Sequence, residues 1–259
     1  MTSATLADLA DLPGFDAAVD RVRTACAGLS LLPRARRQHD LVVAESRVRG
    51  ARASASLEGA QVTAERVLQV MAGQVADPVD AVVAAALRVT SAARGAATLV
   101  GTAPAQALAR LHLAAATGLV DDPDLVGRPR RPMQPVAELG DLGPPEDPQQ
   151  TLRRLTDLLR APAAVPALAV LAAAHAELAC GRPFAVANGL LARALDRVVL
   201  AARGLDADGL AVPEFGHAAG GAGAYVADLA AYRRGDWGVW LDHCATAVVR
   251  GAAEARAAG

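Results

Sequence analysis

Residues 181–195, with the sequence GRPFAVANGLLARAL, are the most informative stretch of the chain. They contain Asn188, the only asparagine among 259 residues, in a chain that has neither lysine nor isoleucine. Pro183 fixes its own backbone and disfavours a helix at Arg182, so we expect a turn here. Asn188 is then placed as the N-cap of a helix over 189–203. A helix start reached through small residues is also a ready anion site, although an ordinary cap explains the local chemistry equally well.

The composition around this stretch favours an all-α protein. Apolar residues make up 53% of the chain and aromatic residues 3%, so the core consists mainly of alanine, leucine and valine. Alanine and leucine are among the best helix formers, and no run of alternating strands with turn signals stands out. The longest apolar run, 161–178, carries Pro166, His175 and Glu177 and predicts a buried central helix rather than a membrane span.

Helix signals recur along the rest of the chain, and we expect two helical parts that share a core, 1–100 and 101–259. Thr63 and Asp77 are placed as helix N-caps, and Asp147 precedes another helix start. A proline-rich loop over 118–148 and a glycine-rich flexible joint over 216–225 interrupt the pattern. The remaining helices are expected over 15–29, 32–56 with an interruption near Gly50, 63–73, 77–100, 104–118, 147–159, 163–180, 225–234 and 236–257.

Charge and cysteine content narrow the classes of partner. The net charge of −1 does not indicate nucleic acid or an anionic membrane as a partner. The first residues lack the basic and apolar blocks of a signal peptide, so a cytoplasmic protein is expected. Cys26, Cys180 and Cys244 are far apart, which predicts free thiols and no zinc motif.

Among the histidines, His175 is expected in the core with a hydrogen-bond partner. His112, His217 and His243 are scattered along the chain.

The informative stretch resembles the core motif of Fic (Fido-fold) proteins, whose pattern is approximately H-P-F-x-[D/E]-G-N-G-R-x-x-R. The motif is commonly preceded by an alanine-rich helix with a histidine seven positions upstream, where His175 falls in this chain. The residues that match in position and order are Pro183, Phe184, Asn188, Gly189 and Arg193.

Two other segments agree with this resemblance, which covers roughly residues 30–255. Ser54–Gly59, with the sequence SASLEG, resembles the inhibitory motif [S/T]-x-x-x-E-[G/N] that one class of Fic proteins carries before the core. Residues 236–241, DWGVWL, resemble the helix that follows the family's core, with Tyr225 upstream. Residues 127–132, GRPRRP, fall where the family has a flap hairpin that aligns the target, and this basic, proline-broken form is either a partner-binding loop or only a linker. A short β-hairpin flap is expected within the loop over 118–148.

The resemblance implies a mostly helical fold and transfer of AMP, or of another phosphate-containing group, from a nucleotide to a protein hydroxyl. In the family, the motif histidine is the general base, the acidic residue holds Mg²⁺, and the glycine-asparagine loop cradles phosphate. This assigns phosphate binding to Asn188, Gly189 and Arg193. It assigns the inhibitory role to Glu58, with Ser54 in the same motif, because the family's inhibitory glutamate pairs with the second motif arginine. Family members often form homodimers, so a homodimer is compatible with the resemblance.

The departures from the motif fall on the reactive positions. Arg182 replaces the catalytic histidine, and a guanidinium stays protonated and cannot act as a general base. Val186 replaces the metal-binding acid, Leu190 replaces the first motif arginine, and Ala187 replaces a glycine. Loss of the base alone would cost about 10²–10⁴ in rate. We therefore assign no metal ligand, and Mg²⁺ binding is disfavoured. ATP is the candidate ligand, and no cofactor is assigned with certainty.

Two functions follow from this pattern. The first is a catalytically impaired pseudoenzyme that binds a nucleotide or a protein partner. The alternative is an active transferase with altered chemistry, in which Asn188, Gly189, Arg193 and Glu58 still serve a nucleotide. The pair Glu58–Arg193 has two interpretations as well. A structural salt bridge is favoured, and an inhibitory contact that guards a nucleotide pocket is the other.

Overall fold

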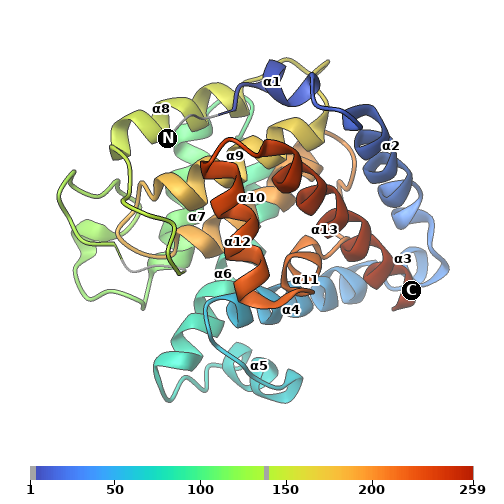
Figure 1. Cartoon of the computed structure of the whole chain (residues 1–259). Coiled ribbons are helices and arrows are strands. Elements are labelled where there is room, and N and C mark those ends of the chain that lie inside the picture. Colours follow the sequence, from blue (N-terminus) through green and yellow to red (C-terminus); the bar gives the residue numbers. More distant parts are fainter. Residues whose placement is uncertain (1–3, 137–139, 259) are drawn as a thin grey trace.

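The computed structural model describes residues 4–136 and 140–258, and the regular secondary structure within these ranges is helical, apart from one isolated bridge (Figure 1). The predicted all-α class is therefore confirmed. The α-helices are α1 (Leu6–Ala10), α2 (Phe15–Cys26), α3 (Pro33–Arg37), α4 (His39–Leu57), α5 (Ala64–Met71), α6 (Pro78–Ala97), α7 (Pro104–Ala116), α8 (Pro148–Leu159), α9 (Ala167–Gly181), α10 (Asn188–Ala202), α11 (Pro213–Ala218), α12 (Gly221–Arg233) and α13 (Trp237–Ala257). Two short 3-10 helices, η1 (Leu29–Leu31) and η2 (Pro123–Leu125), complete the set.

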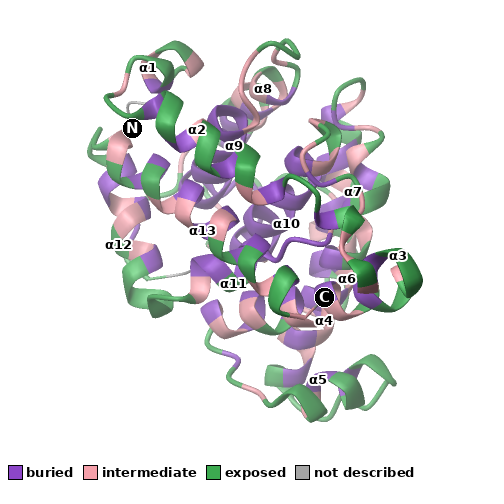
Figure 2. Cartoon of the chain, turned by 90° about the vertical axis from the view of Figure 1, so that its right-hand side faces the viewer, coloured by how far each residue is buried: buried purple, intermediate pink, exposed green. Residues whose placement is uncertain are grey.

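The centre of the molecule is the pair α9 and α10, which Figure 2 shows as the most buried part of the chain. Every residue of α9 from Leu168 to Gly181 is buried, and so is every residue of α10 from Asn188 to Leu200. Helices α6, α8, α12 and α13 pack around this pair. A helix that is apolar on all sides belongs inside a protein, so the prediction of a buried central helix is confirmed. None of the helices in the described ranges is long and apolar enough to cross a membrane.

Local capping chemistry sets several helix starts, as predicted. The Thr63 hydroxyl accepts a hydrogen bond from the Arg66 amide at 3.2 Å, and α5 begins at the next residue. The Asp77 carboxylate accepts from the Asp80 amide at 2.9 Å, with proline at the first position of α6. Asp147 caps α8 in the same way. These caps satisfy backbone donors that a helix start leaves without partners.

Two expected interruptions are wrong, because the glycines concerned allow close helix packing instead. The helix break falls at Gln38, and Gly50 lies inside α4. A Cβ atom on Gly50 would lie 2.4 Å from Nη2 of Arg197, so a larger residue does not fit. The expected flexible joint is also ordered, since α11 reaches Ala218 and α12 starts at Gly221. There, a Cβ on Gly216 would lie 2.1 Å from the carbonyl oxygen of Ala247 in α13.

The connection between α7 and α8 contains no β-hairpin in its described part, so the expected hairpin flap is wrong for these residues. Its regular features are η2 and one isolated bridge between Thr117 and Val120. Six prolines lie between positions 123 and 145. Proline has no N–H to donate to a strand ladder, which explains why a loop forms in place of strands.

The three cysteines, all within the described ranges, are free, as predicted, and the structure shows that they are also buried.

Candidate functional site

The loop between α9 and α10, residues 182–187, carries the motif and is closed by unusual backbone geometry. Arg182 (φ 51°) and Ala187 (φ 63°) both adopt the left-handed conformation. For residues with a Cβ atom this conformation costs roughly 1–2 kcal/mol each. The surrounding structure must therefore hold the loop in place. Phe184, 2% exposed, anchors it in the core, as predicted.

Asn188 stabilises the loop, and its predicted role as an N-cap is wrong. The N-cap position belongs to Ala187, and Asn188 is the first residue of α10. Its side chain points back across the loop, where Nδ2 donates to the carbonyl of Phe184 at 2.9 Å and Oδ1 accepts from the Phe184 amide at 3.1 Å. Because the left-handed turn at Ala187 sets the start of α10, the side-chain amide of Asn188 is not needed as a cap, and it binds both polar backbone groups of one loop residue.

Arg182, at the position of the family's catalytic histidine, is 5% exposed and directed into the protein. Its Nε donates to the carbonyl of Cys180 at 3.2 Å, and its Nη2 donates to the carbonyl of Gly143. These donors bind backbone oxygens of the chain itself. The side chain therefore ties the α7–α8 connection to the end of α9.

Arg130 is the main contact by which the α7–α8 connection covers the motif loop, and the sequence analysis did not single it out. It is 3% exposed. Its amide donates to the carbonyl of Pro183 at 2.9 Å and its Nε to the carbonyl of Arg182 at 2.8 Å. The guanidinium also donates to the carbonyls of Pro132, at 2.9 Å, and Glu146. The motif GRPRRP thus supplies a buried arginine that holds the loop by hydrogen bonds. No local sequence signal distinguishes it from the arginines of a basic surface loop.

His112 supports the same loop from α7. Its ring stacks on Phe184 with centroids 4.0 Å apart. Nδ1 accepts from the Gly127 amide at 3.0 Å, so Nε2 carries the hydrogen that it donates to the carbonyl of Val186 at 3.2 Å. Burial lowers the pKa of His112 to about 4, which keeps the ring neutral at physiological pH. Val186 thus offers only a backbone oxygen, and that oxygen is already bonded.

The structure brings Ser54, Glu58 and Arg193 together, as the resemblance implies. Arg193 is completely buried in α10, and its Nη2 donates to Oε1 of Glu58 at 2.5 Å. Its Nε donates to the Ser54 hydroxyl at 2.8 Å. Burial opposes the charge of Arg193, but Glu58 and Tyr225 more than offset this and raise its pKa. The guanidinium carbon lies 5.5 Å from the centre of the Tyr225 ring.

A second arginine one turn further along α10 repeats this arrangement. Nε of Arg197 donates to Oε1 of Glu214 at 2.6 Å, and its Nη1 donates to the Ser46 hydroxyl at 3.0 Å. Each arginine therefore binds one serine of α4 and one carboxylate. Together the two contacts fix α4 along α10.

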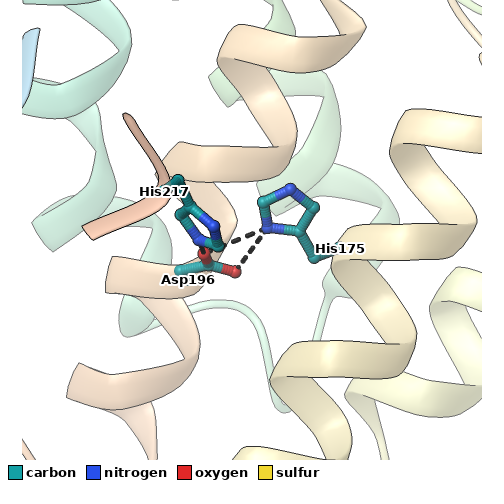
Figure 3. Close-up of side chains that lie close together, drawn as sticks. All are labelled: His175, Asp196 and His217. Atoms are coloured by element: carbon teal, nitrogen blue, oxygen red, sulfur yellow. Dashed lines mark hydrogen bonds and ion pairs between the residues drawn. The ribbon is translucent and has the colours of Figure 1, made fainter. Parts of the chain in front are cut away.

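Beside Arg193 lies a buried polar cluster that the sequence analysis missed, since it treated His217 as one of the scattered histidines (Figure 3). Nδ1 of His175 lies 2.9 and 3.0 Å from the two carboxylate oxygens of Asp196, and Nε2 of His217 lies 2.7 Å from one of them. Nε2 of His175 contacts the Tyr225 hydroxyl at 2.6 Å. The prediction that His175 is a core histidine with a hydrogen-bond partner is confirmed. No sequence signal could have found the cluster, because its four side chains lie on four different helices.

Comparison with solved structures identifies the architecture. The chain superposes on a Fic family protein from Desulfovibrio desulfuricans with a TM-score of 0.69 and 20% identity, over 100% of this chain and 76% of that one. A fragment of Caenorhabditis elegans Fic-1, residues 134–508, gives a TM-score of 0.66 at 16% identity, over 94% of this chain and 72% of that one. A single-residue variant of the same fragment gives 0.63 at 14% identity with the same coverage. The chain therefore has the Fic (Fido) fold.

The sequence comparisons add no relative. No protein-family model matches the chain, and no curated protein matches it.

Proposed function

We propose that this chain is a Fic-fold protein that has lost efficient adenylyl transfer and acts by binding a nucleotide or a protein partner. The observation that carries the proposal is the state of Arg182. A general base must take a proton near neutral pH, and a guanidinium does not. Its donors are, in addition, bonded to the carbonyls of Cys180 and Gly143.

The other replaced positions support the same conclusion. Val186 has no ligand atom in its side chain, and its carbonyl is bonded to His112. Leu190 is 2% exposed and packs in the core. Phosphoryl-group chemistry depends on cationic clamps and usually on a metal, and neither side chain supplies one.

An active transferase with altered chemistry is the second candidate. It is supported by Asn188, Gly189 and Arg193, which keep the family's phosphate-binding positions, and by the contact between Glu58 and Arg193. In this interpretation Glu58 occupies the guanidinium that a phosphate would otherwise bind. In the structural interpretation, the same salt bridge only fixes α4 to α10.

Calorimetric titration of ATP with Mg²⁺ into wild type and Glu58→Gln tests the binding proposal. A carboxylate-free side chain leaves Arg193 as a buried cation without its partner, so a phosphate becomes favourable there. Removing one partner of such a pair costs about 3–5 kcal/mol of stability, and bound ligand should restore part of it. Glu65→Gln, an exposed glutamate at the start of α5, is the matched control.

Tighter ATP binding by Glu58→Gln than by Glu65→Gln supports a guarded nucleotide site. No binding by any of the three proteins at millimolar ATP removes the nucleotide from the proposal and leaves partner binding. Transfer of label from ATP to protein by the wild type, abolished by Asn188→Ala, would overturn the pseudoenzyme and support the altered transferase.

A further inference from the structure

A continuous chain of polar contacts runs from the surface, through helices that are distant in the sequence, to Tyr225, whose ring lies 5.5 Å from the guanidinium carbon of Arg193. Its order is Asp228, His243, His217, Asp196, His175 and Tyr225. His243 contacts Asp228 at 2.7 Å and His217 at 2.9 Å. His243 lines a surface hollow of about 610 Å³, whereas His175, Asp196 and His217 are buried.

When its histidines are neutral and its carboxylates are ionised, this chain of contacts has too few N–H hydrogens. Nδ1 of His243 faces the carboxylate of Asp228, and Nε2 of His217 faces that of Asp196, so both nitrogens must carry hydrogen. The contact between the two rings, His217 Nδ1 to His243 Nε2, needs a third hydrogen. Two neutral imidazoles have only two N–H groups. The chain therefore needs one additional positive charge.

A metal ion can supply this charge as well as a proton can. Asp196 is buried, with its side chain 1% exposed. Arg193 is already paired with Glu58 at 2.5 Å, so this guanidinium does not balance Asp196.

We propose that His175, Asp196 and His217 bind a divalent transition-metal ion of the zinc class. The ligand atoms would be Nδ1 of His175, Nε2 of His217 and one carboxylate oxygen of Asp196, and a water molecule would complete a four-coordinate site. With the ion bound, His217 keeps its single hydrogen on Nδ1 and donates it to His243. His243 then donates its own Nδ1 hydrogen to Asp228, and His175 donates from Nε2 to the Tyr225 hydroxyl. Every contact of the chain is satisfied without an extra proton.

The three ligand residues lie close enough together to bind such an ion after their side chains adjust. One ligand atom from each residue already lies within 4.8 Å of the other two. Zinc binds histidine nitrogen and carboxylate oxygen at about 2.1 Å, which places tetrahedral ligands about 3.4 Å apart. The nitrogen-to-oxygen contacts of 2.7–3.0 Å would have to widen by roughly 0.5 Å. Two imidazoles and a carboxylate are a donor set that zinc and neighbouring divalent ions accept.

The surroundings match those of a metal centre. Metal-bound histidines usually donate their second N–H to a carboxylate, a carbonyl or another fixed acceptor, which orients the ring. The pair His243–Asp228 supplies this for His217, and Tyr225 supplies it for His175. The ion would join α9, α10 and α11, and it would enter during folding because the site is closed. This inference does not depend on nucleotide binding.

The deciding experiment uses the full chain, unfolded with chelator and refolded with Co²⁺ or Zn²⁺. We expect about one ion per refolded chain by elemental analysis, and the intense visible absorption bands of four-coordinate Co²⁺. Less than about one tenth of an ion per chain, in protein that regains its helical circular dichroism, would overturn the proposal. The cluster would then be held together by hydrogen bonds without a metal ion.

Variants separate this site from adventitious metal binding. His217→Gln should lose the ion, whereas His39→Gln, which changes a partly exposed histidine outside the cluster, should keep it. If His217→Gln does not fold, Asp228→Asn tests the proposal instead. Asp228 would not contact the ion, and it lies partly exposed at the surface hollow, so this variant should fold. It should weaken Co²⁺ binding about 10–100-fold, while Asp242→Asn in the same hollow should not. Equal affinity of the two Asp variants would contradict the proposed role of the His243–Asp228 pair.

Discussion

The two hydrogen bonds between Asn188 and Phe184 explain why this chain keeps a single asparagine. Arg182 and Ala187 hold the loop in a conformation that costs energy, and the amide of Asn188 binds both polar backbone groups at its centre. Aspartate lacks the donor and leucine lacks both groups. The side chain is therefore specified by the loop, whatever the activity of the site.

Asn188→Ala should lower the free energy of unfolding by about 2–4 kcal/mol, because it leaves two buried backbone groups without partners. A urea titration measures this from the shift in midpoint at unchanged slope. A loss of about 1 kcal/mol or less would match a simple helix cap and would contradict the role in the loop.

His112 should make the fold sensitive to acid. Its pKa is about 4 in the folded protein and 6.5 when the chain is unfolded, so the unfolded state binds the proton first. Stability should therefore fall as the pH drops from about 6.5 to about 4, by roughly 3 kcal/mol from this group. Unfolding titrations between pH 7 and pH 4 test this. His112→Asn should be less stable at pH 7 and should show a smaller decrease; an unchanged decrease would show that another group is responsible.

At the scale of helices, α4 is positioned by two arginines of α10 and by a glycine that lets them approach. The side chains of Arg197 and Glu214 fill the space in which a Cβ atom of Gly50 would lie. Because both partners belong to a buried ion pair, they cannot move away cheaply.

Gly50→Ala should therefore destabilise the protein by about 1–3 kcal/mol, although alanine is the better helix former. Gly95→Ala is the matched control, since Gly95 also lies inside a helix, and a Cβ there would meet nothing within 4 Å. It should stabilise by about 0.5–1 kcal/mol. Thermal unfolding of both variants shows whether each substitution lowers or raises the stability. A change in the same direction for both would contradict the packing argument.

The comparison of Gly50 with Thr63 shows which elements could be predicted from the sequence. Thr63 and Asp77 act on amides three residues away, so residue type and spacing suffice to locate the helix starts. The role of Gly50 depends on Arg197 and Glu214, which are distant in the sequence. The same holds for Arg130, and for the histidines of the cluster around Asp196. The motif gave the Fic fold through resemblance, but the left-handed turn at Ala187 and the direction of the Asn188 side chain depend on the assembled loop.

At the scale of the whole molecule, the α7–α8 connection closes over the motif through side chains and not through a sheet. Arg130→Gln should release this cover, because a shorter neutral side chain cannot reach the carbonyls that the guanidinium binds. We expect faster amide exchange and faster proteolysis at the described residues near Arg130. Arg131→Gln, its exposed neighbour in the sequence, is the control. Equal protection in the two variants would show that the loop is held by other contacts.

During synthesis, α4 is made long before the arginines of α10 that bind it. Ser54 leaves the ribosome 139 residues before Arg193. At 5–20 residues per second the delay is roughly 7–28 s. During this time the serines and Glu58 of α4 have no guanidinium to bind, and Gly50 has nothing to pack against. The nascent N-terminal helices must therefore wait in a loosely packed state until α10 has been synthesised, and rare codons between these segments would lengthen their exposure to chaperones and proteases.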